Sequence, residues 1–188
     1  MKIHKYVSLG MLLLTVLHLI FVWQVLKTRA FIVNASGVLV AILFIVIVIA
    51  CHSMRDTRKR HQWHFLLSWL AFFVLVVHIV TYFVDFSSYK RKIEKVVLDE
   101  FQLENINVGD YYGSCDVGYI YAKVKVVVKE HKISDIILIE HRNERGAKAE
   151  GIIDLIISKQ TVDVDAVSGA TNSSKVIKKA IVNAMEKY

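Results

Sequence analysis

Residues 165–171 read DAVSGAT and stand directly before residues 172–188, which have the apolar spacing of an amphipathic helix. The small residues Gly169 and Ala170 let a backbone approach a bulky ligand closely. The start of a helix offers unpaired N–H groups and a positive dipole end, which suit a phosphate group. Thr171 adds a hydroxyl at this point. Taken alone, these residues favour an ordinary loop in which Ser or Thr caps the helix.

Three other stretches change this interpretation. Residues 109–113 read GDYYG, residues 118–119 are a Gly-Tyr pair, and residues 141–146 read HRNERG. Together with the Asp-x-x-Ser-Gly-Ala-Thr motif, and in this order, they resemble the family of FMN-binding domains that carry FMN covalently. The FMN subunits of the sodium-pumping NADH:quinone oxidoreductase and of the Rnf complex belong to that family. In this resemblance GDYYG corresponds to an opening turn and HRNERG to a His-x-x-Glu segment.

The resemblance implies that FMN is joined through its phosphate to the Thr171 hydroxyl. A flavin transferase that uses FAD as donor would make this bond outside the cytoplasm. The residues that the resemblance assigns to FMN binding are Thr171, Asp165, Ser168, Gly169, Ala170, Glu144, Gly118 and Tyr119.

The first half of the chain contains three long apolar runs, at residues 6–26, 31–51 and 65–84. Each is close to the roughly 20 residues that a helix needs to cross a bilayer. None contains Lys, Arg, Asp or Glu, and 55% of the whole chain is hydrophobic. The sequence therefore predicts a three-helix transmembrane domain at residues 1–88. A linker helix at residues 89–104 and an α+β FMN-binding domain at residues 105–188 are expected to follow.

Shorter patterns predict the elements of the α+β domain. Residues 118–128 and 133–141 read as strands joined by a turn at 129–132, and residues 147–159 read as a helix. In the last helix we expect one buried stripe, formed by Ile177, Ala180, Ile181 and Ala184.

Basic residues indicate how the helices cross the membrane. The loop at residues 53–63 carries four basic side chains against one acidic one, and Lys2 and Lys5 lie on the same side. The positive-inside rule then places the N-terminus in the cytoplasm and the FMN domain outside, although residues 90–92 are also basic. External flavin attachment, implied by the resemblance, supports the same orientation. We expect a multi-pass protein of a bacterial or archaeal cytoplasmic membrane, and no nucleic-acid partner.

Four histidines form two pairs with the same spacing. His4 and His18 are fourteen residues apart, as are His64 and His78. On a helix this spacing leaves two side chains roughly 40° apart around the axis and ~21 Å apart along it. If the first and third helices are parallel, His4 lies at the depth of His64 and His18 at that of His78. Each level can then supply both axial ligands of a b-type haem.

The His-x13-His spacing resembles that of di-haem membrane cytochromes, including transmembrane ferric reductases. We therefore predict two b haems, one near each leaflet. Two alternatives stay open: histidines inside a membrane also serve as hydrogen-bonding contacts between helices, and His52 and His61 are rival ligands at the cytoplasmic end.

Two functions fit these expectations. In the first, the chain is a transmembrane flavocytochrome that passes electrons from a quinol or a cytoplasmic-side donor through the haems to FMN, and on to an extracytoplasmic acceptor. In the alternative, it is a haem-free, membrane-anchored FMN carrier subunit of an Rnf-type redox complex. Expected partners are membrane lipid, the flavin transferase, and a quinone or redox subunits. The sequence shows no nucleotide-binding loop, so we do not expect this chain to oxidise NADH directly. An oxidoreductase and an electron-transfer subunit both fit the sequence.

Overall fold

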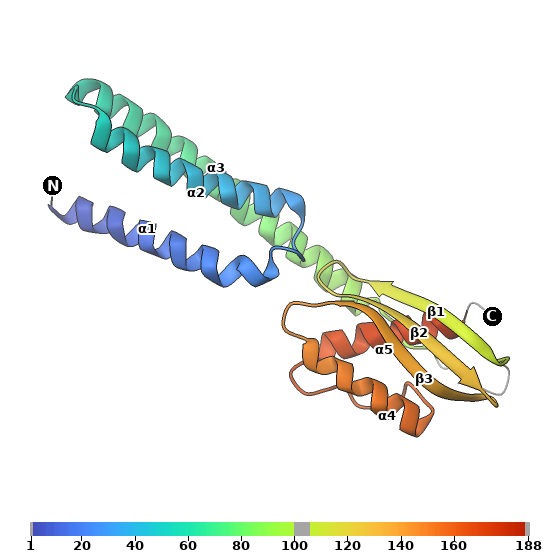
Figure 1. Cartoon of the computed structure of the whole chain (residues 1–188). Coiled ribbons are helices and arrows are strands. Elements are labelled where there is room, and N and C mark those ends of the chain that lie inside the picture. The colour runs from blue at the N-terminus through green and yellow to red at the C-terminus, as the bar shows by residue number, and fades with distance from the viewer. Residues whose placement is uncertain (1, 100–105, 187–188) are drawn as a thin grey trace. The chain divides into compact units, whose positions relative to one another are not determined.

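The chain divides into two compact units, Met1–Ser87 and Ser88–Tyr188. The structure, a computed structural model, describes residues 2–99 and 106–186. The first unit is helical, and the second combines a small sheet with helices, as Figure 1 shows.

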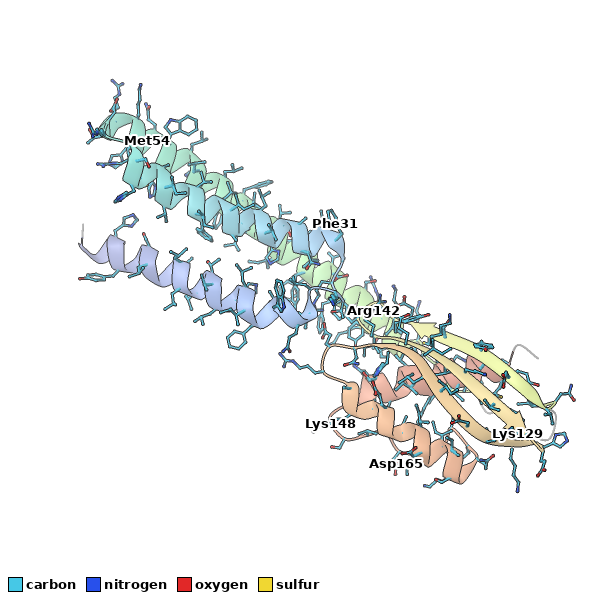
Figure 2. The ribbon with its side chains drawn as sticks, viewed as in Figure 1. Phe31, Met54, Lys129, Arg142, Lys148 and Asp165 are labelled. Carbon is cyan, nitrogen blue, oxygen red and sulfur yellow. The ribbon has the colours of Figure 1, made fainter. Side chains whose placement is uncertain are left out.

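The first unit is built from long helices. α1 spans Lys2–Val22 and is followed by a short 3₁₀ helix, η1, at Trp23–Val25. α2 spans Phe31–Ser53, and Figure 2 labels Phe31 at its start and Met54 just after its end. α3 spans Thr57–Glu94, so its last turns belong to the second unit.

Local signals explain where these helices begin. The Asp56 carboxylate accepts hydrogen bonds from the N–H groups of Arg58 and Lys59, at 2.9 and 3.2 Å, and so caps the start of α3. Before α2, the Thr28 hydroxyl donates to the Val25 carbonyl at 2.8 Å and shapes the turn. Proline is absent from the chain, so no proline interrupts the helices.

Three helices are long and apolar enough to cross a membrane: Tyr6–Val25, Phe31–Ser53 and Thr57–Glu94. The first coincides with the first predicted apolar run to within one residue at its end, and the other two contain the second and third runs. Their large apolar side chains are mostly exposed, with Phe31 at 85% and Phe21 at 74%. A hydrocarbon solvent would cover such a surface, and the three helices therefore suggest membrane association.

The second unit contains a three-stranded antiparallel sheet in the order β1-β2-β3. Its strands are β1 (Gly109–Asp116), β2 (Tyr121–Lys129) and β3 (Lys132–Arg142). After the sheet come the 3₁₀ helix η3 (Ala147–Gly151), α4 (Ile152–Lys159) and α5 (Thr171–Met185). α5 packs against β1 and β2, as Figure 1 shows, whereas α4 lies next to β3.

The core of this unit lies between β2 and α5. Every second residue of β2 is fully buried, which is the pattern of a strand with one face on a core. These residues are Ala122, Val124, Val126 and Val128. The stripe predicted on the last helix is confirmed, because Ile177, Ala180, Ile181 and Ala184 are all fully buried.

The strands after residue 120 agree with the sequence prediction. β2 and β3 coincide with the two predicted strands to within a few residues, and the turn between them falls at Glu130 and His131. Both turn residues have positive φ, 50° and 54°, as a type I′ hairpin turn requires.

The interpretation of GDYYG as an opening turn is wrong, because these residues begin β1 and pair in register with β2. Gly113 allows a close approach: a Cβ there would lie 2.1 Å from the carbonyl oxygen of Ala180 and 2.4 Å from the nitrogen of Ala184. This glycine is therefore a packing position of the sheet against α5.

The segment between the units also differs from the prediction. In place of a separate helix at 89–104, α3 itself continues to Glu94, and residues 95–99 are not helical. Residues 100–105 lie outside the described residues. The helix expected at 147–159 is present, with its first turn in the tighter 3₁₀ form as η3.

Candidate functional site

The start of α5 carries the SGAT turn. Thr171 is the first helical residue and is exposed, and Ala170 before it is buried. Because the N-cap residue is Ala170, no side chain of that residue bonds the first N–H groups of the helix. Gly169 has a φ of +76°, which favours glycine. The ordinary N-cap by Ser or Thr, which these residues alone favoured, is not what the structure shows.

The segment before this turn is fastened to α5. The hydroxyl of Ser174, which is fully buried, accepts a hydrogen bond from the N–H of Val167 at 3.1 Å. One turn further along, the Lys178 ammonium donates to the carbonyl of Val164. The two bonds hold Val164 and Val167 against α5, and so position the segment that leads into the turn.

Burial lowers the pKa of Lys178, and the nearby carboxylates of Asp163 and Asp165 oppose this shift. Asp165 and Ser168, two predicted site residues, are exposed beside the turn. Figure 2 labels Asp165.

The HRNERG segment packs on the first turn of α5. Gly146 is buried against Ser173: a Cβ at Gly146 would lie 1.9 Å from the Ser173 Oγ and 2.7 Å from its Cβ. The Asn143 side-chain oxygen accepts the Gly146 N–H at 3.0 Å and holds the loop closed. Glu144, the predicted site residue of this loop, is half-buried. Figure 2 labels Arg142 and Lys148, which flank the loop.

The side chain of His141 lies inside the domain. Only 2% of its side chain is exposed, and its Nδ1 lies 2.9 Å from Oε1 of Glu150. Its Nε2 is buried and has no hydrogen-bond partner among the described residues.

The Gly-Tyr pair forms the tight turn between β1 and β2. The Asp116 carboxylate accepts the N–H of Gly118 at 2.7 Å, and Gly118 has a φ of +96°. Tyr119 is 2% exposed and its ring stacks on that of Tyr89, with ring centres 4.5 Å apart and planes 14° apart. The Tyr89 hydroxyl in turn accepts a hydrogen bond from the side-chain amide of Asn172 at 2.9 Å.

Three of the four predicted elements therefore meet at the start of α5. HRNERG contacts Ser173, the Gly-Tyr turn reaches Asn172 through Tyr89, and the SGAT turn is continuous with the helix. GDYYG lies elsewhere, since Gly113 contacts Ala180, roughly 14 Å along α5 from Thr171. Sequence reasoning missed Tyr89, because only the folded contact with Asn172 connects it to the motif.

Residues 118–186 match the family model described as the FMN-binding domain. The match includes all eight residues predicted to bind FMN, whose individual roles stay predictions, and it excludes GDYYG and the N-terminal helices. No curated protein and no solved structure matches the chain. The match supports an FMN-binding domain in this part of the chain, and it suggests a flavin-based electron-transfer role.

The histidines of the first unit, which include the four predicted haem ligands, lie outside the residues that match the FMN-binding domain. The rings of His4 on α1 and His64 on α3 have their centres 5.7 Å apart. His78, which belongs to the second predicted pair with His18, lies on α3 beside Ser36 and Gly37 of α2. The rival ligand His61 and His64 line a cavity of about 460 Å³, together with Phe65, Ser68, Trp69 and Phe72. Among the described residues, no group of three or more His, Cys, Asp or Glu gathers that could hold a metal ion.

Proposed function

We propose that this chain is a membrane-anchored electron-transfer flavoprotein whose FMN is bound covalently to Thr171. The observation that carries the proposal is the exposed Thr171 hydroxyl at a helix start without a side-chain cap, inside the residues that match the FMN-binding family. The N–H groups at the start of a helix suit the phosphate that the bond would place beside the first turn of α5.

The attachment requires only one nucleophile from this chain, the Thr171 oxygen. In the transfer from FAD, the Thr171 oxygen would replace the AMP oxygen on the FMN phosphorus, so that AMP and the hydroxyl proton leave. The positive φ of Gly169 and the small side chain of Ala170 keep the approach to Thr171 open. Once bound, FMN supplies the redox chemistry, while the protein supplies position and surroundings.

Variants at Thr171 test the attachment. The full chain, produced together with a flavin transferase, should show flavin fluorescence on a denaturing gel. We expect Thr171→Ala to lose this fluorescence, because the attacking oxygen is gone, and Thr171→Ser to retain part of it. Thr161→Ala is the matched control, since Thr161 lies in the loop before the site and its hydroxyl accepts a hydrogen bond from the N–H of Asp163. Fluorescence that persists in Thr171→Ala would contradict the proposal.

We further propose that the three apolar helices span the cytoplasmic membrane of a bacterium or archaeon, with the FMN domain on the outer side. The length and composition of the helices and the four basic residues among residues 53–63, where α2 ends and α3 begins, support this orientation. An outer FMN domain would also meet the external flavin transferase that attachment requires.

A second candidate function, a flavocytochrome, is favoured by the approach of His4 and His64. Metal–imidazole bonds are about 2 Å long, so two rings on opposite sides of one metal have centres about 6 Å apart. The observed 5.7 Å is close to this value. Two imidazoles are the full axial set of a b-type haem, so the absence of a larger ligand cluster in the described residues is compatible with it.

The hydrogen bonds of the two α3 histidines also fit such a role. Nδ1 of His78 lies 2.9 Å from the Ser36 hydroxyl of α2, and Nδ1 of His64 lies 3.3 Å from the Ser68 hydroxyl. Gly37 lies beside His78, with a built Cβ only 3.0 Å from Cε1 of the ring. When Nδ1 donates its proton to a second group, Nε2 keeps the lone pair that binds a metal. These bonds would hold Nε2 of His64 and His78 ready as ligands.

Haem content decides between the two candidates. In a reduced-minus-oxidised optical spectrum, we expect His64→Ala and His78→Ala to lose haem signal and to keep covalent flavin. His61→Ala is the matched control, because His61 lines the same cavity, and it should keep both signals. Loss of haem in His61→Ala alone would move the ligand role to His61. Flavin without haem in the unmodified chain would leave the haem-free carrier subunit of an Rnf-type complex, with a quinone or redox subunits as partners.

A further inference from the structure

The end of α3 and the residues that follow it, up to Asp99, are bound along one face of α5. Tyr89, Ile93 and Asp99 receive hydrogen bonds from three α5 side chains, at 2.9, 3.0 and 2.8 Å. The donors are Asn172, Lys175 and Lys179, which lie on one face of the helix by their spacing. Residues 88–99 are thus part of the second unit, although the family match begins only at residue 118.

Within this segment, Tyr89 is the residue that is hydrogen-bonded to the neighbour of the proposed attachment residue. Its hydroxyl bonds the side chain of Asn172, the residue that follows Thr171. Its ring covers one face of Tyr119, which is almost fully buried, while Tyr89 itself remains partly exposed. The exposed part of this aromatic pair therefore belongs to Tyr89.

We propose that Tyr89 is a flavin-site residue that is supplied by the last turns of α3. The proposal rests on the attachment of FMN to Thr171 and goes beyond it. A flavin tethered at Thr171 brings a flat aromatic ring system to this end of α5, and aromatic side chains stack on such rings or meet them edge-on. Tyr89 offers a partly exposed aromatic ring, and its bond to Asn172 positions the first turn of α5.

A nearby phenol gives a specific signal. An excited flavin takes one electron from a neighbouring tyrosine, and the electron then returns to the oxidised phenol, so the flavin loses its fluorescence without net reaction. Phenylalanine does not donate in this way, whereas tryptophan does. The fluorescence lifetime of the bound flavin therefore reports whether residue 89 is its neighbour.

The experiment uses the full chain with covalent FMN. We expect Tyr89→Phe to lose the short lifetime component and to shift the flavin reduction potential, and Tyr89→Trp to restore the short component. Tyr112→Phe is the matched control. Tyr112 is 50% exposed, and it precedes Gly113, which faces α5 far from Thr171, so it points away from that helix. It should leave the lifetimes unchanged.

The outcomes separate this inference from the proposed function. Unchanged lifetimes and potential in Tyr89→Phe, with normal covalent flavin, would overturn the role of Tyr89 and leave the attachment intact. Should Tyr89→Phe not fold, Tyr89→Leu, which also lacks the electron-donating phenol, should lose the short component, and unchanged lifetimes and potential in Tyr89→Leu would overturn the role. A chain without covalent flavin would instead contradict the proposed function.

Discussion

Lys178 is unusual because it is a lysine on the buried face of α5. It is 7% exposed, between the fully buried Ile177 and Ala180, and its ammonium reaches the carbonyl of Val164. Burial of the charged form is unfavourable and lowers the pKa, although Asp163 and Asp165 act in the opposite direction. The bond to Val164 gives this lysine a structural role beside the flavin turn.

The lowered pKa of Lys178 predicts a pH dependence of stability. Between this lowered pKa and the ordinary value of about 10.4, the unfolded chain binds a proton that the folded chain does not. The free energy of unfolding should therefore rise with pH across this window in the unmodified protein. Lys178→Met should remove this rise, which denaturant unfolding at a series of pH values would measure. An equal rise in the variant would contradict the assignment to Lys178.

Some residues of the site could be predicted from the sequence, and others could not. Thr171 and Gly169 belong to one short motif, so their position before a helix was visible without a structure. Tyr89 and Ser36 carry no local signal, because their contacts with Asn172 and His78 join residues 83 and 42 positions apart. Contacts of this kind appear only when the fold brings distant segments together.

At the scale of elements, the contact between the HRNERG loop and α5 is the most sensitive one near Thr171. The φ of Gly146 is −96°, which alanine adopts readily, so only the space beside Ser173 requires a glycine. The Ser173 hydroxyl can rotate away from a new methyl group, but its Cβ cannot.

Gly146→Ala should therefore displace the loop or the first turn of α5. We expect a loss of about 1–3 kcal/mol in the free energy of unfolding, the usual cost of overpacking, together with less covalent flavin. Gly151→Ala is the matched control, since a Cβ there meets nothing within 4 Å. Denaturant unfolding and gel fluorescence measure the two effects.

A double variant shows whether the cause is this contact. On a Ser173→Gly background both clashing atoms are absent, and Gly146→Ala should then be nearly neutral. The same loss on both backgrounds would mean that the Gly146–Ser173 contact is not responsible.

The elements themselves were predictable to different degrees. The apolar runs, β2, β3 and the stripe of α5 follow simple periodicities, and the structure contains them. β1 was missed because GDYYGSCD has two glycines and no β-branched residue. Its strand form comes from pairing with β2 and from the packing of Gly113 on α5, which are tertiary effects.

At the scale of the whole molecule, the chain combines two units of opposite character. The first exposes apolar helices that suit a lipid environment, and the second buries a compact core around α5. The apolar runs predicted the first unit, and the second was predicted from the family resemblance and from the strand and helix patterns after residue 105. The sequence did not predict that α3 continues into the second unit, since the basic residues 90–92 end the apolar pattern before the helix ends at Glu94.

Mass spectrometry of the unmodified chain is the decisive test of the covalent attachment of FMN to Thr171. The full chain, produced with a flavin transferase and then denatured, should be heavier than its sequence by one FMN less one water. Fragmentation should locate this mass on the peptide that contains Thr171. A chain of unmodified mass, or a flavin located on any other residue, would contradict the attachment at Thr171.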